Sequence, residues 1–93
     1  MKKYEVMYIV RPTLDADATK AVIELVTNIF KNNNSTVLET KEIGLKDLAY
    51  EIEHHKKGFY VWHLVEATKE AVNEFNRVVR INEDIIRDIL VLA

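Results

Sequence analysis

The chain has 93 residues, of which 48% are hydrophobic and 30% charged, with no cysteine and a formal net charge of −2 at pH 7. This composition predicts one soluble globular domain, residues 1–93, and excludes a disordered chain, a disulfide framework and thiolate chemistry. The near-neutral charge argues against broad non-specific nucleic-acid binding. The apolar run 6–10 is too short for a signal-peptide core or a membrane span, so we expect a cytoplasmic protein.

The first half of the chain predicts a strand, a helix and a long second strand. Residues 4–10 alternate as a strand does, and Pro12 ends the strand because proline lacks the N–H that a ladder needs. Asp15 is a candidate N-cap for a helix over residues 16–33, and Asn34 is the candidate left-handed residue after it. The apolar stripe of this helix contains Ala18, Ala21, Val22, Leu25, Ile29 and Phe30. Residues 36–52 predict the long strand, with a bend or bulge at Gly44.

The second half predicts a strand, a helix and a last strand. A charged turn leads into the third strand, residues 59–67, and Thr68 is the candidate N-cap of a helix over residues 69–80. The last strand, residues 85–92, is apolar on both faces. The turn contains His54, His55, Lys56 and Lys57, and the apolar face of the second helix contains Ala71, Val72, Phe75, Val78 and Val79. The third strand offers two apolar sets, Phe59-Val61-Val65 and Tyr60-Trp62-Leu64, and its alternation leaves open which one faces the core.

The order β-α-β-β-α-β is that of the split βαβ, ferredoxin-like fold of the α+β class. Right-handed crossovers then place both helices on one face of a four-stranded antiparallel sheet. The other face is free to meet solvent or a partner. Apolar residues on that face are either a partner signal or the ordinary apolar area of a small protein, and the candidates are Met7, Ile9, Tyr60, Trp62 and Leu64.

Several short segments, in the right order and over essentially the whole chain, resemble the bacterial small-subunit ribosomal protein S6 family. They are Met1–Val6, Arg11–Pro12, Gly44 with Lys46 and Leu48–Ala49–Tyr50 and Ile52, Gly58 with Tyr60, and Ile81–Arg87. The resemblance implies a non-catalytic structural protein that needs no cofactor or metal. It also implies binding to the central domain of small-subunit (16S) ribosomal RNA as a pair with ribosomal protein S18, which scaffolds an RNA junction on the ribosome.

The chain departs from the family pattern at four positions. Asp47 and Glu51 are acidic where a basic or neutral residue and a proline are usual, His54 stands where a lysine is usual, and Ile43 replaces a common tryptophan. The acidic residues weaken the positive potential of the predicted hairpin.

Residue type and position give the candidate contacts of this binding role. Lysine and arginine suit phosphate, and tyrosine offers a flat face for stacking. The candidate RNA contacts are Lys2, Lys3, Tyr4, Lys46, Tyr50, His54, Lys56, Arg80 and Arg87. The candidate partner-protein contacts are Leu45, Leu48, Ala49 and Tyr50. The plain alternative is a solvated terminus for the first lysines, a solvated charged turn for the hairpin, and a helix-dipole role for arginines at the end of the second helix.

Other classes of protein share features with this chain. An RNA-recognition-motif domain binding single-stranded RNA shares the strand order and the Lys57-Gly58-Phe59 start of its signature, but Tyr60 stands where glycine or alanine is required. An acyl-phosphate hydrolase needs an anion-binding loop, and the loop 11–15 has no glycine. Adjacent histidines supply at most two metal ligands. The sequence is also compatible with a regulatory module that binds a small ligand and acts as an oligomer. We expect a monomer.

Overall fold

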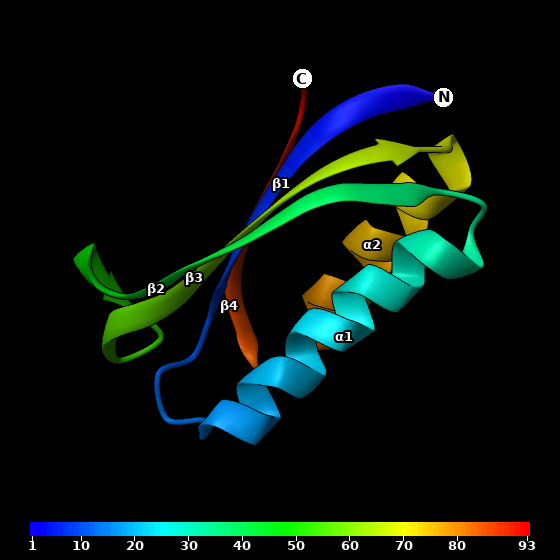
Figure 1. Ribbon diagram of the computed structural model, residues 1–93. Helices are drawn as coiled ribbons and strands as arrows, with labels where there is room; N and C mark the ends of the chain where they lie inside the picture. The colour runs from blue at the N-terminus through cyan, green and yellow to red at the C-terminus, as the bar shows by residue number, and fades with distance from the viewer.

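The six elements occur in the predicted order and form a four-stranded antiparallel sheet with two helices on one face (Figure 1). The computed structural model describes all 93 residues. Its elements are β1 (Lys2–Val10), α1 (Ala16–Asn32), β2 (Thr36–Ile52), β3 (His55–Ala67), α2 (Lys69–Ile81) and β4 (Ile85–Leu92). The strand order β2-β3-β1-β4 makes β2 and β4 the edges and confirms the split βαβ fold. Neither helix has the length and apolar character that a membrane span requires.

Local side-chain chemistry sets the helix ends as the sequence predicted. The carboxylate of Asp15 accepts the N–H three residues further on at 2.8 Å, and the hydroxyl of Thr68 does the same at 3.2 Å. After α1, Asn34 takes the left-handed conformation with φ 57°. The Ser35 N–H then donates to the Phe30 carbonyl at 3.0 Å, which satisfies one of the carbonyls left free at the helix end.

The core lies between the helices and the inner face of the sheet. Val61 and Val65 are fully buried, so of the two apolar sets of β3 it is Phe59-Val61-Val65 that faces the helices. The rings of Phe30 and Phe75 join the two helices, with centroids 5.7 Å apart. The fully buried large side chains are Tyr8, Phe30, Phe75, His63, Val6, Val10, Val26, Val61 and Val65.

The predicted stripe of α1 is partly wrong. Ala21 and Leu25 are exposed, whereas Thr19 and Val26 are buried. The apolar positions of α1 cover a broad arc, and the packing of the helix against the sheet and α2 decides which part of that arc turns inward.

The predicted turn between β2 and β3 is also corrected. Only Glu53 and His54 form it, with φ 47° and 68°, and Ile52 pairs directly with His55. Two residues with positive φ form the kind of tight turn whose twist suits a hairpin. Lys56 therefore belongs to β3. The bulge expected at Gly44 is confirmed by a register shift and by its φ of 104°.

The outer face of the sheet, which we call the open face, is not covered by a helix. Its β3 residues Tyr60, Trp62 and Leu64 are half-buried. Ile9 is only 8% exposed because it lies over Gly58, where an added Cβ would collide with its side chain. The open face is thus partly closed by its own side chains near the hairpin.

Candidate nucleic-acid and partner-protein interface

Predicted RNA contacts from two edge strands meet on the open face near the hairpin. Lys46 of β2 pairs with Gly58 of β3, and Arg87 of β4 pairs with Ile9 of β1. Since paired residues share a face and Ile9 lies over Gly58, both cations belong to the open face. Alternation along β3 puts Lys56 on the same side. Residues about forty positions apart in sequence therefore border one surface.

The acidic residues of the hairpin lie against other partners. The carboxylate of Asp47 is 3.9 Å from the Lys57 ammonium, and that of Glu51 is 3.7 Å from the imidazole of His54. These contacts are solvent-exposed and contribute little to stability. The hairpin-end cations take part in none of the five ion pairs of the structure; they are Lys46, Lys56, Arg80 and Arg87.

Two of the predicted RNA contacts touch each other across the sheet. The guanidinium carbon of Arg87 lies 5.9 Å from the ring centroid of Tyr50, within the range of a cation–π contact. Tyr50 remains 63% exposed, so its ring is available for a further stacking contact.

The end of α2 lies beside the tip of the hairpin. Arg80, in the last turn of α2, and Glu53, in the hairpin turn, line one hollow of about 200 Å³. Arg80 is exposed there and adds a fourth cation to the hairpin end of the molecule.

The predicted RNA contacts Lys2, Lys3 and Tyr4 start β1 at the other end of the sheet, where both termini lie (Figure 1). Lys2 pairs with Ala67, beside the start of α2. Lys2, Tyr4 and Lys69 line one hollow there, and the ring of Tyr4 packs against the core. Lys69, the first residue of α2, thus lies beside two predicted RNA contacts from the start of β1.

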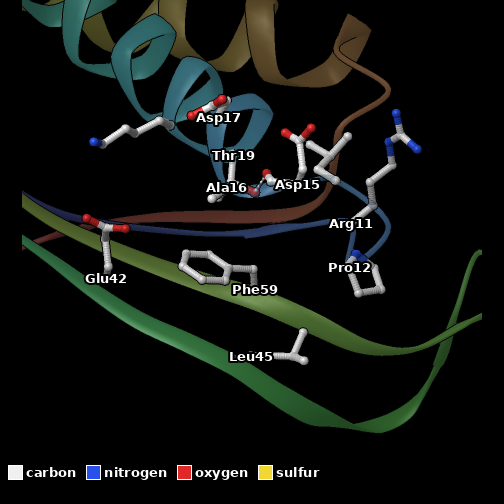
Figure 2. A pocket seen from close by; sticks show the side chains of 11 residues that line it. Arg11, Pro12, Asp15, Ala16, Asp17, Thr19, Glu42, Leu45 and Phe59 are labelled. Carbon is white, nitrogen blue, oxygen red and sulfur yellow. Dashed lines mark hydrogen bonds between the residues drawn. The ribbon is translucent and has the colours of Figure 1, made fainter.

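The predicted partner-protein contacts do not share one face. Leu45 pairs with Phe59 and points toward α1, on the helix-covered side (Figure 2). Leu48 instead approaches Gly58 on the open face. Ala49 and Tyr50 are exposed along the edge strand. β2 thus presents side chains to both sides of the sheet.

The open face also holds a pair that sequence reasoning missed. The ammonium of Lys41 lies 5.3 Å from the ring centroid of Trp62, its partner in the β2–β3 register. The same ammonium is 3.5 Å from the Glu39 carboxylate. Only the strand register, which the bulges shift, brings these residues together.

The buried histidine of β3 belongs to the core. Its Nε2 is 2.8 Å from the Tyr8 hydroxyl and its Nδ1 is 2.9 Å from the Thr40 hydroxyl. Burial lowers the pKa of His63 to about 4, so the ring is neutral at pH 7. Burial, with a smaller contribution from the Glu42 carboxylate, raises the pKa of Tyr8 above its usual value. The structure contains no group of three or more His, Cys, Asp or Glu residues arranged to hold a metal ion.

These features define a class of protein: a small split βαβ domain that presents exposed cations and aromatic rings on an open sheet face, as binding domains do. Residues 3–91 match the family described as ribosomal protein S6. The chain belongs to this family, which is structural and non-enzymatic.

Relatives and a solved structure agree with the family match. The chain is 53% identical over 91 residues to small ribosomal subunit protein bS6 of Phytoplasma australiense, covering 98% of each chain. It is 54% identical over 89 residues to bS6 of Acholeplasma laidlawii, covering 96% of this chain and 94% of the relative. A crystal structure of 30S ribosomal protein S6 from Thermotoga maritima superposes with a TM-score of 0.94 at 22% identity, covering 99% of this chain and 87% of that one, which supports the fold. The role of the chain is thus that of a cytoplasmic small-subunit ribosomal protein.

Proposed function

We propose that residues 1–93 act as one domain that binds the central domain of small-subunit ribosomal RNA together with ribosomal protein S18. The isolated chain is a monomer, and the pair holds an RNA junction in its assembled form. The observation that carries this proposal is the group of hairpin-end cations without ion pairs, Lys46, Lys56, Arg80 and Arg87, in a chain that belongs to a ribosomal family.

The charge of this chain suits an RNA interface shared with a partner protein better than one that the chain forms alone. Each cation that neutralises a phosphate releases counterions, so binding weakens as salt rises. The net charge of −2 limits the electrostatic free energy that this chain alone gains on binding RNA, and a partner protein supplies the rest of the positive surface. The binding free energy of the pair then favours the RNA conformation that both proteins contact.

The RNA-binding experiment compares three proteins in the presence and absence of S18. They are the wild-type chain, the double variant K46Q/R87Q, and a control variant, K31Q, on the exposed side of α1. With a central-domain RNA fragment, we expect the double variant to bind about tenfold more weakly and with a salt slope reduced by about two, because two phosphate contacts are lost. The control variant should match wild type.

The proposal fails if unrelated RNAs bind equally well, or if S18 makes no difference to retention of the central-domain fragment. A loss of binding free energy in K31Q about half that in K46Q/R87Q, in proportion to one charge removed against two, would show that overall charge, and not the hairpin end, governs binding. Sedimentation velocity of the pure chain tests the monomer, and a concentration-dependent dimer would contradict it.

A further inference from the structure

The end of β2 carries a bulge close to the hairpin turn. The register of β2 with β3 shifts between Asp47 and Ile52. The four residues 48–51 stand there opposite the single β3 residue Lys56. A bulge bends its strand and re-aims side chains, and bulges are common beside functional sites. This bulge therefore directs side chains of β2 that a regular ladder would leave at the edge of the sheet.

Tyr50 of this bulge is the only exposed aromatic side chain of the protein. It is 63% exposed, whereas every other aromatic side chain is buried or half-buried. The guanidinium carbon of Arg87 in β4 lies 5.9 Å from the centroid of its ring. Since β2 and β4 are the two edges of the sheet, this contact requires the bulge to reach over the strands between them. Arg87 thus holds the ring over the open face and leaves most of it uncovered.

The surface around this ring is positively charged. Lys46, Lys56 and Arg87 belong to the open face here and form no ion pair. The carboxylates of Asp47 and Glu51 lie instead beside basic side chains of the hairpin, at 3.9 and 3.7 Å. A polyanion placed over the ring would therefore meet cations that have no carboxylate partner within the protein.

An unpaired nucleotide fits both the ring and the cations. The phosphates of an RNA duplex would meet the lysines, but its bases are stacked inside the helix and would leave the ring uncovered. A basic protein segment could cover the ring, but the three cations would repel it. An unpaired nucleotide offers a flat base to the ring and phosphates next to that base.

We propose that the ring of Tyr50 stacks with an unpaired base of the ribosomal RNA, while Lys46 and Lys56 contact the phosphates next to that base. Arg87 keeps the ring in place through its cation–π contact. This inference rests on the proposed function and names the RNA feature that the hairpin end recognises, a junction nucleotide outside the paired helices. It also assigns the Tyr50 side chain to RNA and not to the partner protein.

The test combines variants of the protein with abasic nucleotides in the RNA. Wild type, Y50L and Y50F are titrated with the central-domain RNA fragment in the presence of S18, at several salt concentrations. Y50L removes the ring, and Y50F keeps the ring and loses only the hydroxyl. Each unpaired junction nucleotide of the fragment is made abasic in turn, which removes a base without changing the charge. An abasic nucleotide in a loop away from the junction is the matched control. Because Tyr50 is exposed, both variants should unfold in urea near the wild-type midpoint.

Y50L should bind the fragment about tenfold more weakly, as expected for one lost base stack, but with the salt slope of wild type because no phosphate contact is lost. Y50F should restore most of the lost affinity. One abasic junction nucleotide should weaken the binding of wild type about tenfold and that of Y50L hardly further, because the base and the ring form a single contact.

Failure of the stack is distinguishable from failure of the proposed function. If wild type binds the fragment with S18, the proposed function stands, and the stack is rejected by any of three results: Y50L binds as well as wild type, Y50F loses as much as Y50L, or no single abasic nucleotide weakens wild type. Equal losses in Y50L on intact RNA and on every abasic RNA would also reject it. A loss of S18 binding by Y50L in the absence of RNA would assign the ring to the partner protein instead. If wild type does not bind the fragment with S18, the proposed function fails and the stack fails with it.

Discussion

The buried imidazole of His63 makes the stability of this fold sensitive to acid in a calculable way. The ring is 0% exposed and its two nitrogens lie against the Tyr8 and Thr40 hydroxyls. Both hydroxyls could accept hydrogen bonds from a protonated ring, so hydrogen bonding alone does not prevent protonation. Burial disfavours the charged ring, and it lowers the pKa of His63 from 6.5 to about 4.

The sign and size of the effect follow from the two pKa values. Between pH 6.5 and about 4 the unfolded chain holds a proton on His63 that the folded chain lacks, so stability falls as pH falls. The contribution is fully present above pH 6.5. At 1.36 kcal/mol per pKa unit, the loss amounts to about 2 kcal/mol at pH 5 and about 3 kcal/mol when complete.

Urea unfolding, followed by the fluorescence of the single tryptophan, measures this loss at pH 7, 6, 5 and 4. H63Q removes the titrating group. Its loss of stability between pH 7 and 5 should therefore be about 2 kcal/mol smaller than that of wild type, whatever its absolute stability. H54Q, at a side chain that is 98% exposed, is the matched control and should follow the wild-type curve. Parallel curves for wild type and H63Q would refute the argument.

Three further predictions concern the hairpin and the helix end, each measured by urea unfolding at pH 7. G58A should destabilise the fold by about 1–3 kcal/mol because its Cβ meets the Ile9 side chain, and stability equal to wild type would show that Ile9 can move aside at no cost. D15A should lower the stability by about 1 kcal/mol because the N-cap is lost, and an unfolding midpoint equal to that of wild type would contradict this. The double change E53N/H54G should stabilise by about 1 kcal/mol because both positions have positive φ, whereas a loss of stability would mean that the native side chains are needed.

Local chemistry explains why so much of the fold could be predicted. Asp15 and Thr68 cap their own helices, and Asn34 adopts the left-handed conformation its side chain tolerates. Each of these depends on residues at most a few positions away. The order of elements and the right-handed crossovers then restrict the topology to the split βαβ sheet, which the structure confirms.

Positions that depend on distant partners were predicted less well. The alternation of β3 fits either face, and only the packing of the helices buries Val61 and Val65. The short turn at Glu53 and His54 was missed because it lacks the glycine, asparagine or aspartate that usually marks a two-residue turn. The predicted site residues were named without their grouping, since their distances depend on strand register.

The sequence by itself determined the six elements, the family and the set of cationic and aromatic residues from which an interface can be built, because these depend on local residue patterns. Tertiary structure decided the rest. Antiparallel pairing places Lys46 and Arg87 on one face, while the same register turns Leu45 to the other side, toward α1. Which side chains are free to bind therefore depends on contacts between residues far apart in the chain, and those contacts exist only once the sheet and helices have packed.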